Sequence, residues 1–238
     1  LFEHLMFGGS AHIPDYDTPL QLAGGENNAW TNNDITNYYL TVPKPNVETA
    51  FWLESDRMLE LAFSEQSLEV QRGVVMEEFK QRCLNQPYGD VGHLLRPLAF
   101  RVHPYRWPTI GKELSHIEQA TLDEVKSFFY RFYAPNNAVL AVTGNISWDE
   151  TVRLTEKWFA AIPRRDVPVR RLPQEPEQTQ ERRLTVERNV PLDALFMGYH
   201  MCSRESADYY AFDILSDILS NGRSSRLNRR LVQEQNIF

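Results

Sequence analysis

Apolar residues in the first third of the chain alternate between strand-like and helix-like spacing. Residues 35–42 are rich in β-branched and aromatic types and stop at Pro43, which predicts a strand. From Val47 the apolar residues mostly follow helical spacing, and a second helical stretch is predicted from about Leu68 to Leu84. This order indicates a domain that mixes helices with a sheet.

Capping motifs mark two further helices. Thr121 and Glu124 form a capping box ahead of an apolar run, and Ser147 and Glu150 repeat that spacing. Between these two helices, residues 137–143 are mostly apolar and are followed by a glycine, which predicts a buried strand.

Composition then changes over residues 163–182, which are rich in Pro, Arg, Glu and Gln and predict a surface linker. Strands are predicted after it at residues 184–188 and 194–200. A helix should follow, because positions 207, 210, 211, 214, 215 and 218 are small or apolar and fall on one helical face.

These elements set the expected fold class. With few short βαβ units and no phosphate-binding glycine loop, we predict an α+β domain with helices packed on a mainly antiparallel sheet; a doubly wound nucleotide-binding fold is the alternative. The strand-then-helix order occurs in both halves, about 1–162 and about 183–238. The chain starts without Met, and residues 231–238 still follow a helical pattern, so we expect a domain, 1–238, that is incomplete at both ends.

The amino-acid composition argues against two classes of protein, those that span a membrane and those that bind nucleic acid. The content of 42% apolar and 12% aromatic residues is enough for a sizeable core. The longest apolar runs are a few residues, against about 20 for a membrane span, so no span is expected. A net charge of −7, without a basic stripe interleaved with aromatics, argues against a nucleic-acid partner.

The candidate chemistry begins at Glu3 and His4. On a helix, a histidine four residues before His4, directly upstream of Leu1, would lie on the same face and complete the pattern His-x-x-Glu-His. That pattern is typical of zinc peptidases with the inverted motif. Catalytic zinc usually takes three protein ligands, and Glu78 supplies another carboxylate on a predicted helix.

At this point the sequence resembles the pitrilysin and insulinase family of zinc peptidases, which includes the mitochondrial processing peptidases. The resemblance runs along nearly the whole chain. It rests on residues 1–10, 28–31 with 34–39, 72–79, 103–111 and 222–227, which match the family's motifs in order.

The resemblance implies a role for each matched residue. His4 becomes the second zinc ligand, Glu78 the third and Glu3 the general base, while the first ligand would precede Leu1. Two imidazoles and one carboxylate leave a Zn²⁺ ion positive enough to acidify its water. A neighbouring carboxylate can then take the water's proton.

Two positions leave alternatives open. Glu77 rivals Glu78 as third ligand, because adjacent helical residues point about 100° apart and only one can face the metal. Gln71 stands where the family usually has glutamate, two turns before Glu78. Glutamine can still form a hydrogen bond with a residue that supports the ligands. Compared with glutamate, it places one negative charge fewer near the metal.

The resemblance therefore implies a zinc-dependent metallopeptidase acting on extended oligopeptides or unstructured polypeptides. Its substrate would lie along an exposed strand at Asn28 and Ala29 and use backbone hydrogen bonds. A second domain or subunit of the same family would close a chamber around it. The alternative is a catalytically inactive member that serves as a structural or substrate-presenting subunit.

Overall fold

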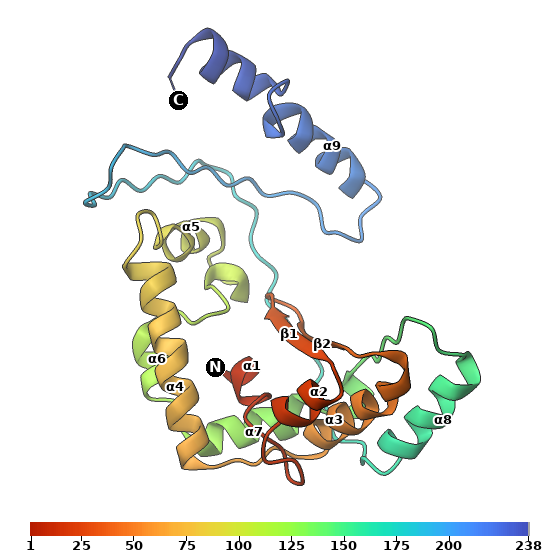
Figure 1. Ribbon diagram of the computed structural model, residues 1–238. Helices are drawn as coiled ribbons and strands as arrows, with labels where there is room; N and C mark the ends of the chain where they lie inside the picture. Colours follow the sequence, from red (N-terminus) through yellow and green to blue (C-terminus); the bar gives the residue numbers. More distant parts are fainter. Residues whose placement is uncertain (238) are drawn as a thin grey trace. The chain divides into compact units, whose positions relative to one another are not determined.

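The computed structural model describes residues 1–237 and has two compact units, Leu1–Ala194 and a second that starts at Leu195 (Figure 1). In the first unit the helices and strands are α1 (Phe2–Leu5), α2 (Asp17–Leu22), β1 (Glu26–Thr31), β2 (Thr36–Thr41), α3 (Val47–Leu59), α4 (Glu65–Phe79), α5 (Val91–Ala99), α6 (Leu114–Glu118), α7 (Leu122–Phe132) and α8 (Trp148–Phe159). The second unit contains α9 (Tyr209–Ser220).

The sheet is an antiparallel hairpin of β1 and β2. Its register pairs Glu26 with Thr41 at one end and Thr31 with Thr36 at the other. The side chain of Asn32 closes the turn by accepting hydrogen bonds from two backbone N–H groups, that of Ile35 at 2.9 Å among them. Helices around an antiparallel sheet confirm the predicted α+β class.

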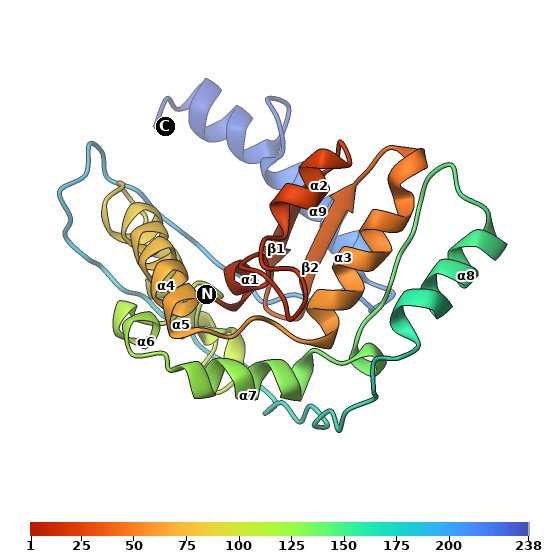
Figure 2. The same cartoon turned by 60° about the horizontal axis from the view of Figure 1, so that its bottom comes forward.

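The short helix α1 lies between α4 and the hairpin, with α7 below it in the views of Figures 1 and 2. Leu5, the last residue of α1, and Met6, which follows it, enter different parts of the core. Leu5 clusters with Leu68 of α4 and Val125 of α7, and Met6 clusters with Phe129 of α7. Contacts with α4, α7 and β1 thus fix the helix that carries the predicted motif.

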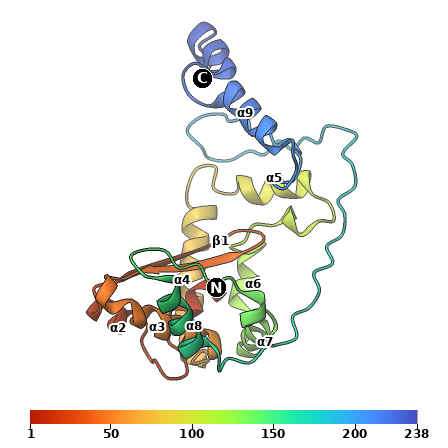
Figure 3. The ribbon, with the colours of Figure 1, turned by 90° about the vertical axis from the view of Figure 1, so that its right-hand side faces the viewer.

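The local sequence signals for helices are confirmed. Thr121 accepts from the backbone of Glu124, whose side chain returns a bond to the Thr121 N–H, so the capping box is complete. Ser147 accepts from the Glu150 N–H at the start of α8. Figure 3 shows α8 beside α3, where Glu48 accepts hydrogen bonds from two side chains of α8.

The three other predicted strands are wrong. Residues 138–143 follow a short 3₁₀ turn as irregular, mostly exposed chain, and Val139 is 95% exposed. Residues 184–188 and 194–200 are irregular and exposed as well. A strand is held by a ladder to a neighbour, and within residues 1–237 no segment pairs with any of these three.

The predicted linker is irregular, as expected, but it is held to the first unit. Glu175 accepts hydrogen bonds from the backbone N–H groups of Arg101, Val102 and His103, at 2.7, 2.9 and 2.9 Å. Arg182 donates to a carbonyl at the end of α5 at 2.5 Å. The segment therefore packs along the loop that follows α5.

In the second unit, α9 confirms the predicted helix, while its apolar side chains, such as Ile214 and Ile218, stay exposed. Across residues 1–237, none of the helices combines the length and apolar character needed to cross a bilayer.

Candidate metal centre

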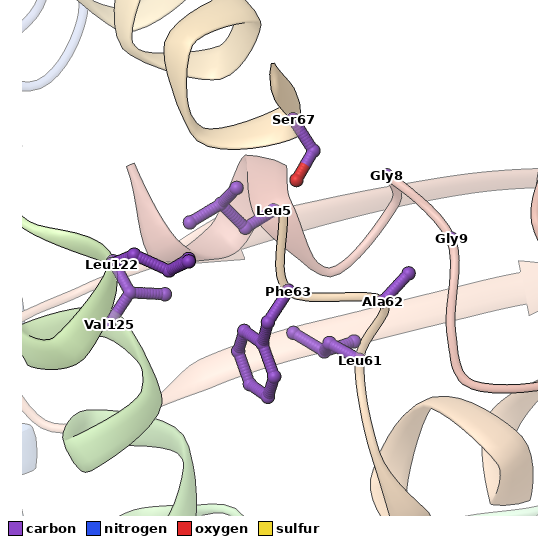
Figure 4. Close-up of a pocket in the computed structure, with 9 residues that line it drawn as sticks. All are labelled: Leu5, Gly8, Gly9, Leu61, Ala62, Phe63, Ser67, Leu122 and Val125. Atoms are coloured by element: carbon purple, nitrogen blue, oxygen red, sulfur yellow. The ribbon is translucent and has the colours of Figure 1, made fainter. Parts of the chain in front are cut away.

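The turn after α1 fixes how this helix meets the rest of the unit. Gly9 has φ +102°, and a Cβ there would lie 2.5 Å from the Pro14 carbonyl oxygen, so the close approach needs glycine. Behind the turn, Leu5, Gly8 and Gly9 line an apolar cavity of about 10 Å³ together with Leu61, Ala62, Phe63, Ser67, Leu122 and Val125 (Figure 4). So small a space leaves no room for a ligand and belongs to the packing of α1.

An aromatic cluster supports the hairpin beside α1. The rings of Phe2 and Tyr133 are tilted against each other with centroids 4.6 Å apart, and the hydroxyls of Tyr133 and Tyr38 are 2.7 Å apart. Burial raises the pKa of both phenols, so both stay protonated. The buried Arg57 guanidinium lies 4.7 Å from the Tyr38 ring centroid and pairs with Glu54. This packing ties β2 to α3 and α7.

The carboxylate of Glu3 is oriented by the hairpin. The hydroxyl of Thr31, the last residue of β1, donates a hydrogen bond to Glu3 Oε2. Its cross-strand neighbour Thr36 lies 3.3 Å away, oxygen to oxygen. Thr31 was not predicted from the sequence as a site residue, because only the fold brings this strand end to α1.

His4 faces Glu78 across the space between α1 and α4. The distance from His4 Nε2 to Glu78 Oε2 is 3.5 Å, and both side chains are partly exposed, at 32% and 26%. This separation is longer than a strong hydrogen bond. Two ligand atoms each about 2.0–2.2 Å from a tetrahedral zinc lie about 3.4 Å apart, so the donor pair fits one edge of a zinc site.

The rival carboxylate points elsewhere. Glu77 is 61% exposed, and its Oε1 pairs with the Lys80 ammonium at 2.5 Å. The geometry thus brings Glu78, rather than Glu77, to His4. The other oxygen of Glu78 pairs with the Arg82 guanidinium at 3.0 Å, a contact that the sequence analysis did not anticipate.

A solvent-open hollow of about 520 Å³ adjoins this pair. It is lined by His4, Gly73, Val74, Glu77, Glu78 and Gln81. Gln71, which was predicted to support the ligands, is half-buried on α4 and does not line the hollow.

The predicted substrate strand is β1. Asn28 is exposed and Ala29 half-buried, and they pair with Tyr39 and Tyr38 of β2. Asn28 Oδ1 accepts the Ala29 N–H at 2.8 Å. Within residues 1–237, β1 has a strand on one side only. The other edge of β1 is therefore free of strand pairing in this part of the chain.

The described residues bring His4 and Glu78 together without a third potential metal ligand. Among residues 1–237, no three side chains of His, Cys, Asp or Glu lie close enough together to hold a metal ion. One imidazole and one carboxylate therefore face each other beside the start of α1.

Comparison with known protein families shows which family the chain belongs to. The profile described as "Insulinase (Peptidase family M16)" matches residues 1–112, and that of "Peptidase M16 inactive domain" matches residues 119–238. The chain belongs to the M16 family. The predicted resemblance to pitrilysin and insulinase is thereby confirmed.

Individual M16 relatives agree with this assignment. The zinc protease PqqE of Helicobacter pylori is 30% identical over the whole chain, which covers 54% of that relative. An uncharacterized zinc protease of Mycobacterium leprae is 28% identical over 99% of the chain and 53% of its own length. The chain thus spans about half the length of these curated relatives.

Solved structures show the same fold. The crystal structure of a protease from Helicobacter pylori matches with a TM-score of 0.84 and 28% identity, over 98% of this chain and 58% of that one. A peptidase M16 inactive domain from Pseudomonas fluorescens matches with a TM-score of 0.78 at 18% identity, over 99% and 57%.

Proposed function

We propose that this chain is the metal-bearing part of a longer zinc metallopeptidase that hydrolyses peptide bonds in extended oligopeptides or unstructured polypeptides. The observation that carries the proposal is the 3.5 Å separation between His4 Nε2 and Glu78 Oε2, with Glu3 next to His4 on α1. M16 membership and relatives named zinc proteases support the same chemistry.

In this proposal His4 and Glu78 are two of three protein ligands. A histidine directly before Leu1 would stand four residues ahead of His4, one helical turn away on the same face, and would complete His-x-x-Glu-His. The bound zinc would supply an acidified water and polarise the scissile carbonyl. Each protein ligand has its own support, since α1 fixes His4 and α4 fixes Glu78.

Glu3 is assigned the proton transfer. As a carboxylate beside the metal position it can take a proton from water and pass it to the leaving amine, a role that contributes about 10²- to 10⁴-fold. The Thr31 hydroxyl donates to Oε2 of Glu3, which leaves Oε1 available for the proton. Asn28 and Ala29 hold the substrate backbone along the unpaired edge of β1.

The domain organisation belongs to the proposal too. We propose two related halves, about 1–162 and 183–238, within a domain that continues beyond the chain, and a second M16 domain or subunit that closes a chamber. Similarity to a structure of the first half of the periplasmic protease PqqL from Escherichia coli supports the second M16 domain or subunit.

A test of the proposal compares the chain that starts at Leu1 with the longer protein. With one ligand missing, the chain is expected to lose far more zinc affinity than the roughly 10- to 100-fold that is lost when a group supporting the ligands is removed. Its peptidase activity should be at background. The measurement is zinc titration against a chelator, with peptide hydrolysis assayed in parallel. Robust, chelator-sensitive hydrolysis by the chain from Leu1 would refute the site.

A second candidate is a catalytically inactive M16 member that presents peptides. The observation that favours it is the match of residues 119–238 to the profile of an inactive domain. The two candidates differ in one measurable outcome, because an inactive member binds peptides in the longer protein and cleaves none of them.

A further inference from the structure

The two oxygens of Glu78 have different partners. Oε2 faces His4 Nε2 at 3.5 Å, whereas Oε1 forms an ion pair with the Arg82 guanidinium, whose Nη1 lies 3.0 Å away. Arg82 thus contacts the one carboxylate of α4 that faces His4. Because the carboxylate is bound at one oxygen, its rotation about the terminal bond is restricted.

The backbone after α4 explains why Arg82 reaches back to Glu78. The helix continues beyond Phe79 as a wider turn over Lys80–Leu84. Within that turn, Cys83 is buried in a core cluster with Val75 and Phe79. Because Cys83 points into the core, the preceding Arg82 side chain projects to the solvent side, where it is 71% exposed.

A neighbouring pair provides a natural comparison. Glu77 and Lys80 form another solvent-accessible ion pair at the same helix end, and His4 is paired with Glu78. Arg82 and Lys80 therefore each place one positive charge near the hollow, and only Arg82 holds the carboxylate that faces His4.

We propose that Arg82 is a positioning residue that holds Glu78 Oε1 and presents Oε2 alone to the metal. The inference rests on the proposed function, since it concerns the same ligand. Carboxylates that ligate metals are commonly fixed by hydrogen bonds from behind, and loss of such a partner typically costs 10- to 100-fold in metal affinity or activity. Arginine suits the role because its planar fork donates in a fixed direction.

Two effects of Arg82 oppose each other. Its positive charge repels a cation at the metal position, while its ion pair with Glu78 Oε1 orders the ligand. The repulsion is weakened by solvent because Arg82 is largely exposed. Arg82 Nη1 lies 3.0 Å from an oxygen of the ligand carboxylate itself, so ordering should dominate, and removal of Arg82 should weaken zinc binding.

The test measures zinc affinity of the longer protein by competition with a chelator, in the wild type and in Arg82→Met, Arg82→Lys and Lys80→Met. Arg82→Met is expected to weaken zinc binding about 10- to 100-fold. Arg82→Lys should recover part of the loss, because lysine restores the charge without the fork. Lys80→Met removes an equal charge from the same helix end and should leave affinity unchanged.

Thermal unfolding of the metal-free variants shows whether each one folds. All of them should fold, because an exposed ion pair contributes little to stability. Equal losses in Arg82→Met and Lys80→Met would mean a general charge effect and overturn the proposal, as would unchanged or tighter binding in Arg82→Met. If the wild type binds zinc, such a result overturns only the role of Arg82. A wild type that binds no zinc overturns the proposed function and this inference together.

Discussion

Glu3→Gln in the longer protein is expected to abolish peptide hydrolysis while leaving zinc content, fold and peptide affinity intact. The amide has nearly the size of the carboxylate but cannot accept the proton of a metal-bound water, so turnover should fall about 10²- to 10⁴-fold or more. Peptide affinity should persist because Asn28 and Ala29 lie on β1, which does not depend on Glu3 for its pairing.

The measurement is single-turnover hydrolysis of an unstructured peptide, with its dissociation constant and the zinc content determined on the same samples. Thr31→Val is a useful companion, because it removes the hydroxyl that orients Glu3 and keeps the side-chain volume. A wild-type rate in Glu3→Gln with one zinc bound would show that Glu3 is not the base.

The second large effect is expected at the ligand on α4. Glu78→Gln should lose most bound zinc, because an uncharged amide replaces one of three protein ligands, whereas Glu77→Gln should retain it. The structural reason is the orientation of the two side chains: Glu78 lies 3.5 Å from His4, and Glu77 is turned toward Lys80. The two variants are matched, since each removes one negative charge from adjacent positions of the same helix.

Metal analysis of the two purified variants decides between the carboxylates. Equal loss of zinc in both variants, or loss in Glu77→Gln alone, would contradict the assignment of Glu78. Retention of stoichiometric zinc in both would remove α4 from the metal site altogether.

Helices were predictable from the sequence because their signals are local. Thr121 and Glu124 lie one turn apart and satisfy each other's backbone groups without help from distant residues. The strand predicted at residues 35–42 was found as β2, where β1 supplies a ladder. The strands predicted at 137–143, 184–188 and 194–200 were wrong, because no described segment pairs with them. Apolar, β-branched composition indicates that a segment can form a strand, but pairing depends on residues far away in the chain.

The contacts of the candidate site likewise divide into a local one, which the sequence encodes, and one that depends on the fold. The contact between Glu78 and Arg82 follows the i, i+4 spacing of a helix, so the sequence contains a local signal for it. The contact between Glu3 and Thr31 depends on the hairpin packing against α1, and no local pattern encodes it. The predicted support by Gln71 stays a prediction.

The most direct test of the zinc site is an anomalous-diffraction map of the longer protein, recorded at the zinc absorption edge. The account predicts one peak about 2.0–2.2 Å from both His4 Nε2 and Glu78 Oε2, with a third protein ligand from the residue before Leu1. A zinc peak at another place in the molecule, or a peak bound by Glu77 instead of Glu78, would contradict it.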